Sequence, residues 1–226
     1  MHIPDGFIDI PTSAAFAAIA AAAVAISLKG AKSSLDEKTA PLAGLTATFI
    51  FAVQMLNFPV AAGTSGHLLG GALAAVLIGP FAATLAITVV LLMQGLLFAD
   101  GGLSAMGLNV FNMSVVGVWV GYTIFLLVKK LLPRSKSSIA IAATIGALLS
   151  VPAAAASFGL QYALGGTSTF SIGAVFTAMI GTHILIGIGE AIITGFAVAA
   201  VMASRSDLVY GFKGETTPLE VRTHNE

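Results

Sequence analysis

Residues 170–203 read FSIGAVFTAMIGTHILIGIGEAIITGFAVAAVMA and hold a single charged residue, Glu190. Apolar runs of 18 or more residues are typical of membrane-spanning helices, because about 20 residues cross the hydrocarbon core of a bilayer. This run of 34 residues is longer than one straight crossing. We therefore expect it to begin as an interfacial turn and to extend past the membrane at its end.

The composition of the whole chain also indicates a membrane protein. Of 226 residues, 57% are hydrophobic and 9% are charged, and the mean hydropathy is +0.99, whereas soluble domains carry about 25% charged residues. The chain is therefore predicted to be an all-α integral membrane protein, with roughly six to eight helices and no room for a separate soluble domain. The net charge is zero and the sequence has no basic stripe, which disfavours nucleic acid as a partner.

Six further apolar runs are separated by polar stretches or by Gly and Pro. They span 12–28, 41–58, 67–79, 81–98, 106–128 and 138–157. Together with 170–203 they predict about seven transmembrane helices. The Gly79-Pro80 breaker divides two of these runs, which form either a tight helical hairpin or one long kinked element. We favour the hairpin.

The basic residues predict the orientation of these helices. All ten fall into three groups, which are Lys29, Lys32 and Lys38; Lys129, Lys130, Arg134 and Lys136; and Arg205, Lys213 and Arg222. The loops on the other side, around 57–66, 99–105 and 158–169, contain no basic residue and only one acidic residue, Asp100. By the positive-inside rule the basic groups are cytoplasmic, so the N-terminus lies outside the membrane and the C-terminus lies in the cytoplasm.

The two ends of the chain differ in character. The opening MHIPDGFIDI lacks the positively charged region with which a signal peptide begins, so we expect these residues to belong to the mature protein. The closing stretch contains GETTPLEVRTHNE and is polar. We expect a single transmembrane domain over residues 1–204 and a flexible cytoplasmic tail over residues 205–226.

Small residues are dense in two of the runs, SAAFAAIAAAAVAIS at 13–27 and GGALAAVLIGPFAATLA at 70–86. Ala and Gly allow helix backbones to approach closely inside a membrane. Packing within the helix bundle is the simpler interpretation. A face for a partner membrane subunit is the alternative.

The opening Met-His pair has the chemistry of a metal chelate. The α-amino group titrates near 7.7 to 8.0, so a metal displaces its proton readily at neutral pH. The Met1 amine and the His2 amide nitrogen close a five-membered ring on a metal, and that amide and the near imidazole nitrogen of His2 close a six-membered ring. These three nitrogens lie in one plane and suit tetragonal Ni(II) or Cu(II). The chain has no cysteine, so any metal site uses nitrogen or oxygen.

A histidine in second position leaves one corner of this plane open. The alternative is that His2 is an accidental residue on a frayed terminus, but the Ile-Pro-Asp-Gly that follows predicts an ordered turn. His67, in FPVAAGTSGHLLGG at 58–71, is our choice for the fourth ligand, because irregular backbone at membrane depth is tolerated only against protein or a water-filled cavity. A histidine that caps the following helix and bonds to a carbonyl is the competing interpretation.

Other polar residues lie within the apolar runs. His183 and Glu190 are seven residues apart, near one helical face. Three interpretations are open. The two residues form a site that a cation passes through or that supports its ligands from outside, a proton-linked switch, or a structural pair that joins two helices. Asn109 and Asn112 either orient an external site or make interhelical hydrogen bonds, and the second is the simpler interpretation. His224 lies in the tail, where we expect it to be solvated.

Four stretches, MHIPDGF, GTSGHLLGG, GLNVFNM and GTHILIGIGEAIITG, resemble the substrate-capture membrane component of nickel and cobalt energy-coupling-factor transporters, the NikM and CbiM group. The resemblance covers nearly the whole chain. It implies seven helices in a prokaryotic cell membrane. It also implies a square-planar site of four nitrogens, from the Met1 amine, the His2 amide and imidazole, and the His67 imidazole.

The resemblance also implies the function and the partners. Ni(II) or Co(II) is a transported substrate rather than a permanent cofactor, and the partners are a transmembrane coupling protein, two ATPase subunits and often a small accessory membrane protein. The sequence contains no GxxxxGK[ST] stretch, so it predicts a transport protein that does not itself hydrolyse ATP by a P-loop. A cobalt-specific homologue serving cobalamin synthesis is the first alternative. A remote one is an intramembrane serine hydrolase that uses Ser65 and His183.

Overall fold

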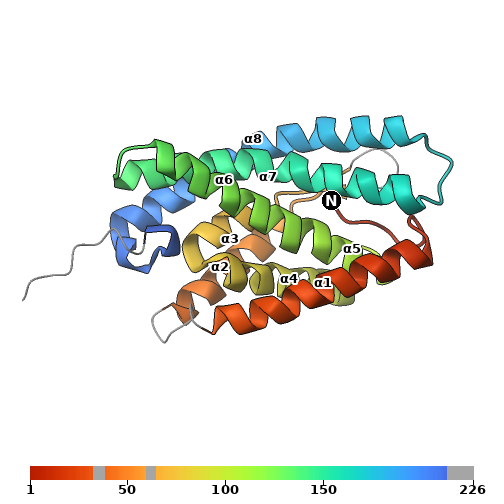
Figure 1. Ribbon diagram of the computed structural model, residues 1–226, viewed down its shortest axis with the longest axis horizontal. Coiled ribbons are helices and arrows are strands. Elements are labelled where there is room, and N and C mark those ends of the chain that lie inside the picture. The colour runs from red at the N-terminus through yellow and green to blue at the C-terminus, as the bar shows by residue number, and fades with distance from the viewer. Residues whose placement is uncertain (33–38, 60–64, 213–226) are drawn as a thin grey trace, which may run out of the picture.

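The computed structural model describes residues 1–32, 39–59 and 65–212. In this part of the chain the molecule is helical apart from a short strand pair (Figure 1). Five helical stretches are long and apolar enough to cross a membrane, namely Ile10–Ala31, Pro80–Leu97, Met106–Leu131, Lys136–Gly165 and Ile172–Leu208. The predicted all-α class is confirmed, and the chain is a multi-pass membrane protein.

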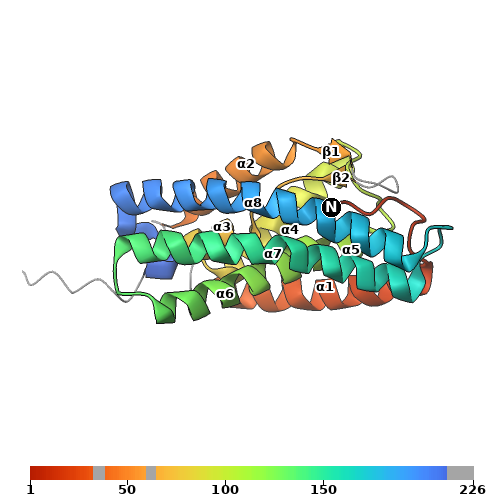
Figure 2. The same cartoon turned by 90° about the horizontal axis from the view of Figure 1, so that it is seen from above.

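The elements follow one another in a simple order. The helices are α1 (Ile10–Ala31), α2 (Ala40–Gln54), α3 (Gly71–Ile78), α4 (Pro80–Leu97), α5 (Met106–Asn109), α6 (Val118–Leu131), α7 (Lys136–Gly165) and α8 (Ile172–Arg205), with a π-helical stretch η2 (Val110–Gly117) joining α5 to α6. Strands β1 (Phe58–Pro59) and β2 (Ser65–Gly66) pair antiparallel. Figures 1 and 2 show α7 and α8 side by side, and α3 lies in the interior against α2, α4, α6, α7 and α8.

The predicted run 67–79 is shorter as a helix than expected. α3 has eight residues and begins only at Gly71, so it is about 12 Å long and does not cross a bilayer by itself. α3 and α4 meet at Gly79, where φ is +87°, and they pack against each other as a hairpin. The preference for a hairpin over one kinked helix is therefore confirmed. α2, with 15 residues, is also shorter than the five long stretches.

The expected loop at 158–169 is mostly helix. α7 continues to Gly165, and the connection to α8 is limited to 166–171. Within this stretch Gln161 is fully buried and accepts a hydrogen bond from Asn112 at 2.8 Å. The hydroxyl of Tyr162 is hydrogen-bonded at the start of this connection, to Ser168 and Phe170.

The charged residues separate along the bundle. The described basic residues lie where α1, α6 and α8 end and where α7 begins, and we call this the basic end. Lys38, Lys213 and Arg222 lie outside the described residues. Asp5, Asp9 and Asp100 lie toward the opposite end, with the loops 98–105 and 166–171. This separation agrees with the charge pattern behind the predicted orientation, which stays a prediction.

The first residues of the expected tail pack against the bundle. Short 3₁₀ turns follow α8 at Ser206–Leu208 and Tyr210–Phe212. Val209 is fully buried, and the Lys129 ammonium donates to the Gly211 carbonyl at 2.7 Å. Residues 213–226, with His224, lie outside the described part.

The two stretches rich in small residues have different roles. All of α3 is buried, and a Cβ added to Gly71 would lie 2.8 Å from the main chain of Gly117. The second stretch thus packs inside the bundle, because only a glycine permits this approach. α1 is different, since only Ser13, Ala20, Ser27 and Ala31 are buried along it. Most of its surface is open to lipid or to a partner.

Candidate metal site

Residues 1–9 form an ordered segment that enters the bundle instead of trailing from it. The Phe7 amide donates to the Pro4 carbonyl at 3.4 Å, and Gly6 supplies the positive φ of +72° that this turn needs. The predicted turn at Pro4-Asp5-Gly6 is therefore present. Figure 1 shows the N-terminus within the length of the helix bundle, not at its end.

One side of this segment is held by the loop after α4 and by α5. The amide of Asn109 forms a two-sided clasp on Ile3, because its Oδ1 accepts from the Ile3 N–H at 2.8 Å and its Nδ2 donates to the Ile3 carbonyl at 3.4 Å. The Gly102 N–H donates to the same carbonyl at 2.8 Å. Further out, an oxygen of Asp5 accepts from the main-chain N–H and the hydroxyl of Ser104. These bonds fix the segment one residue beyond His2.

The other side of the segment is held by the end of α7. The Asp9 N–H donates to the Gly165 carbonyl at 2.7 Å, and the Thr167 N–H donates to the Phe7 carbonyl at 3.2 Å. The Phe7 ring lies 5.9 Å from the ring of Phe158 and 5.2 Å from that of Tyr162, centroid to centroid. Residues 7–9 are thereby anchored before α1 begins.

The anchored segment buries the start of the chain. Met1 is fully buried and His2 is 4% exposed. Removal from water disfavours the charged ammonium, so burial lowers the pKa of the Met1 amine to about 4, although the nearby Asp100 carboxylate opposes the shift. Burial, and then the charge of the amine, lower the pKa of His2 to about 3. Both groups hold unprotonated nitrogen lone pairs at neutral pH.

His67 lies directly against His2. The two ring centroids are 4.7 Å apart with an angle of 36° between the planes, and His67 is fully buried. Its Nδ1 lies 2.7 Å from the Leu68 carbonyl, which only accepts, so Nδ1 carries the proton and Nε2 carries a lone pair. Within the described part of the chain, that Nε2 is buried without a hydrogen-bond partner.

His67 does not cap the following helix. Four residues separate it from the start of α3 at Gly71, and the N–H groups of Leu69 and Gly70 are bound by the carboxylate of Glu190. The helix-capping part of the competing interpretation is therefore wrong, whereas the bond to a carbonyl that it also expected is present, to Leu68. The helix begins only at Gly71 because Gly70, with a φ of +75°, is outside the helical region, and His67 remains in irregular chain beside the N-terminus.

Asp100 is part of the same neighbourhood and was not among the predicted site residues. Its Oδ2 lies 3.6 Å from Nε2 of His2 and accepts a hydrogen bond from the Asn57 side chain at 2.7 Å. A carboxylate facing the second nitrogen of a metal-binding imidazole fixes the ring and raises its basicity. The available signal was its position, as the one acidic residue in loops that lack basic residues.

The loop around Asp100 leaves no space beside His2. Gly101 has a φ of +94°, and a Cβ added there would lie 2.8 Å from Nδ1 of His2 and 3.0 Å from Nδ2 of Asn109. A Cβ on Gly102 would meet the main chain of Asp5. Both glycines are needed because the loop approaches the N-terminal segment at main-chain distance.

The two asparagines have separate roles. Asn109 orients the N-terminal segment, as described above. Asn112 makes the interhelical bonds of the simpler interpretation, since its side chain donates to Gln161 and accepts from Ser157, both on α7. Of the two, only Asn109 bonds to the N-terminal segment, at the residue next to His2.

His183 and Glu190 do not form a pair with each other. Nδ1 of His183 lies 2.7 Å from the Met179 carbonyl of its own helix, and its Nε2 is buried without a hydrogen-bond partner in the described residues. Glu190 bonds to the chain before α3, so it joins α8 to that loop. The side chain of Ser65, the nucleophile of the hydrolase alternative, lies outside the described residues.

The arrangement can bind a metal ion only with the help of the main chain. Over residues 1–32, 39–59 and 65–212, no three His, Cys, Asp or Glu side chains are grouped as a metal site. The two imidazoles of His2 and His67 are adjacent, however, and the buried amine precedes one of them. Any nitrogen site here therefore draws on main-chain nitrogens.

Comparisons with known proteins identify relatives that are named as metal transport proteins. The model of one family, described as the cobalt uptake substrate-specific transmembrane region, matches residues 2–208. A cobalt transport protein CbiM of Sorangium cellulosum is 33% identical over 92% of this chain and 94% of its own length. A fused nickel transport protein NikMN of Rhodobacter capsulatus is also 33% identical, over 96% of this chain and 66% of its own length. A crystal structure of a truncated transition metal transporter has a TM-score of 0.79 and 34% identity, covering 90% of this chain and 99% of that one.

Proposed function

The chain belongs to the CbiM family and is a nickel/cobalt transport component of that type, and from this premise we propose that it captures Ni(II) at its buried N-terminus. The observation that carries the proposal is a buried, uncharged amine followed at once by an imidazole that lies 4.7 Å from a second imidazole. Burying an amino terminus removes a charged group from water, which costs free energy unless the group is hydrogen-bonded, paired or bound to a metal.

Four nitrogens complete a square plane around the ion. The Met1 amine, the His2 amide and Nδ1 of His2 form the two fused rings, and Nε2 of His67 takes the remaining corner. Nδ1 of His67 carries the proton, so its Nε2 lone pair is available. Nε2 of His2 then faces Asp100, as metal-bound histidines commonly face a carboxylate.

The ligand set selects the class of ion. Hydrated Mg(II) and Ca(II) prefer oxygen ligands, and a buried site of four nitrogens offers none. Ni(II) suits tetragonal nitrogen ligation better than Co(II) does, and it lies above Co(II) in the Irving–Williams order. Co(II) is the second candidate, because the family description and the Sorangium cellulosum relative both name cobalt.

Transport by this chain needs an energy source from outside it. The sequence contains no P-loop stretch, so we propose that it works as the substrate-capture subunit of an energy-coupling-factor transporter. A transmembrane coupling protein, two ATPase subunits and a small accessory membrane subunit are the proposed partners. Few residues of α1 are buried. The outward-facing surface of this helix is a proposed docking face for the coupling protein.

A removable N-terminal extension tests the metal site. The chain is produced with a tag of several residues that a protease removes by cutting directly before Met1. The tag turns the Met1 amine into an amide and removes the five-membered ring. Before cleavage, nickel affinity should be lower by more than the roughly 100-fold that loss of an outer-shell partner costs. After cleavage the protein should bind one Ni(II), measured by titration calorimetry and by metal content.

The control for this experiment is the fold of the tagged protein. Circular dichroism and gel filtration in detergent should match before and after cleavage, so that a difference in affinity reports the amine. Equal nickel affinity in the tagged and cleaved proteins contradicts the proposed site. A parallel Co(II) titration ranks the two ions.

A further inference from the structure

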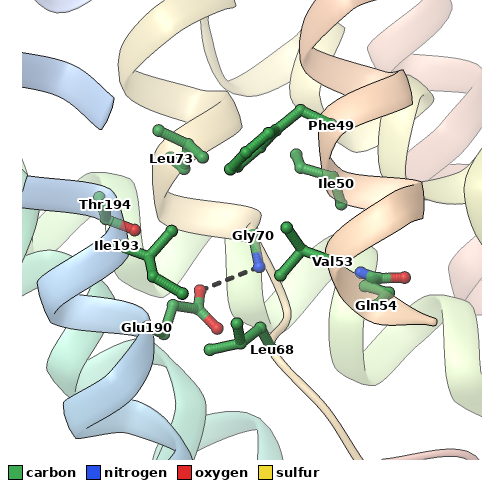
Figure 3. A pocket seen from close by; sticks show the side chains of 10 residues that line it. All are labelled: Phe49, Ile50, Val53, Gln54, Leu68, Gly70, Leu73, Glu190, Ile193 and Thr194. Atoms are coloured by element: carbon green, nitrogen blue, oxygen red, sulfur yellow. Dashed lines mark hydrogen bonds between the residues drawn. The ribbon is translucent and has the colours of Figure 1, made fainter. Parts of the chain in front are cut away.

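The loop that carries His67 is held from two sides at Leu69. The Leu69 N–H donates to Oε2 of Glu190 at 2.5 Å, and the Leu69 carbonyl accepts from Nε2 of Gln54 at 2.6 Å. The next N–H, of Gly70, donates to Oε1 of Glu190 at 3.0 Å, as Figure 3 shows. Glu190 belongs to α8 and Gln54 to the end of α2.

Both clamping side chains are buried. Glu190 is 2% exposed and Gln54 is fully buried. No cation within the described ranges forms an ion pair with Glu190, so its compensation comes from the two N–H groups and from the N-terminal end of α3. Burying a carboxylate costs free energy, so the place of Glu190 at this loop points to a role there.

The clamp closes one wall of a cavity. Figure 3 shows Glu190, Gly70 and Gln54 beside a pocket between α2, α3 and α8 whose other lining is mainly apolar, from Phe49, Ile50, Val53, Leu68, Leu73 and Ile193. Gly70 has a φ of +75°, and a Cβ there would lie 2.8 Å from Ile50. The loop is thus pressed against α2 at Gly70.

We propose that Glu190 and Gln54 are positioning residues that hold His67 in the place where it completes the metal site. His67 is two residues before the clamped peptide, and its own Nδ1 is bonded to the carbonyl of Leu68, the residue between them. The direction of its Nε2 therefore follows the orientation of this stretch of main chain. This inference rests on the proposed function, because it assumes that His67 binds the ion.

The clamp connects the fourth ligand to two helices that do not hold the other three. α2 and α8 carry Gln54 and Glu190, whereas Asn109 of α5 holds the N-terminal segment at Ile3. A shift of α2 or α8 relative to α5 would withdraw His67 while Met1 and His2 stay in place. The clamp thereby gives the ion a route to release.

Three variants separate positioning from charge. Glu190→Gln removes the charge and one acceptor, Glu190→Asp keeps the charge but shortens the reach, and Gln54→Met removes a neutral donor. If the clamp acts by position, all three should weaken nickel binding by about 10- to 100-fold and speed its transfer to a chelator. The ligand-field absorption of bound nickel should also change, because the fourth nitrogen is displaced. Ile193→Val, in the same pocket without a bond to the loop, should behave as wild type.

A double-mutant cycle identifies the residue through which the clamp acts. In a His67→Ala background, Glu190→Gln should cause no further loss of affinity, because the ligand that it positions is absent. An undiminished loss in that background, or normal binding by Gln54→Met and Glu190→Asp, would overturn the inference. If the wild-type protein with a free Met1 amine binds no nickel, the proposed function fails as well. Normal wild-type binding with unaltered clamp variants overturns the inference alone.

Discussion

Residues 1–9 are bonded mainly to neighbouring main chain, with Asn109 as the one side chain that clasps Ile3, whereas residues 69–70 are bonded to side chains that reach them from two helices. The first segment is bonded at Ile3, Phe7 and Asp9 to the loops at one end of the bundle and to the end of α7. The second is bonded at Leu69 and Gly70 to Gln54 and Glu190.

The difference suggests a division of labour in the proposed site. Main-chain bonds to Gly102, Gly165 and Thr167, together with the Asn109 clasp, hold the segment that carries three candidate nitrogens, so its position depends mainly on the loops at one end of the bundle. A few buried side chains hold the fourth, so its position does depend on helix packing. Substitutions on either side test this division.

Loss of a ligand from the N-terminal segment should have the largest effect. His2→Ala removes the imidazole that binds the metal next to the His2 amide nitrogen. Without this imidazole the amide keeps its proton, so stoichiometric nickel binding should vanish. His67→Ala leaves three nitrogens in place and should weaken binding by at least about 100-fold, since it removes a direct ligand. Titration calorimetry of both variants checks the order. Weaker binding by His67→Ala than by His2→Ala contradicts the division.

The clasp on Ile3 should have the next largest effect. Asn109→Leu removes both hydrogen bonds to Ile3 and should lower nickel affinity by about 10- to 100-fold, because the N-terminal segment loses its orientation. Asn112→Leu is the matched control, three residues along the same span. It leaves Gln161 and Ser157 without their partner and should cost about 1–3 kcal/mol of stability, with unchanged nickel affinity. Thermal unfolding and nickel titration separate the two outcomes.

The space beside His2 should give the smallest effect of the three. Gly101→Ala places a methyl group 2.8 Å from Nδ1 of His2 and should weaken nickel binding by about tenfold, within the range for disturbed ligand geometry. Gly6→Ala is the control, because Gly6 also has a positive φ but a Cβ there has nothing within 4 Å. Both variants carry similar backbone strain. Equal affinities in the two would attribute the effect to strain and not to contact with His2.

The sequence was most informative where the chemistry is local. The chelate of Met1 and His2 follows from two consecutive residues, and the turn at Pro4-Asp5-Gly6 follows from three. The apolar runs predicted the membrane class because hydrophobicity is read along one helix at a time. The hairpin at Gly79-Pro80 followed from a helix breaker for the same reason.

The contacts that hold the site could not be read in this way. Asn109 and Ile3 are 106 residues apart, and Glu190 and Leu69 are 121 apart, so no local pattern relates them. The start of α3 was placed four residues too early, because the positive φ of Gly70 interrupts the helix and one glycine among several does not reveal its backbone angle. α7 was ended too early, because Gln161 is buried through a hydrogen bond to Asn112, 49 residues away, which no local pattern reveals.

The connection between α7 and α8 makes α8 a lever. Gly165 and Thr167 hold residues 7–9 next to the point where α8 begins at Ile172, and Glu190 lies 18 residues further along that helix. At 1.5 Å per residue this arm is about 27 Å long. A tilt of roughly 5° about the connection would move the Glu190 carboxylate by about 2 Å, comparable with the length of a hydrogen bond, while the anchor of the N-terminal segment stays at the pivot.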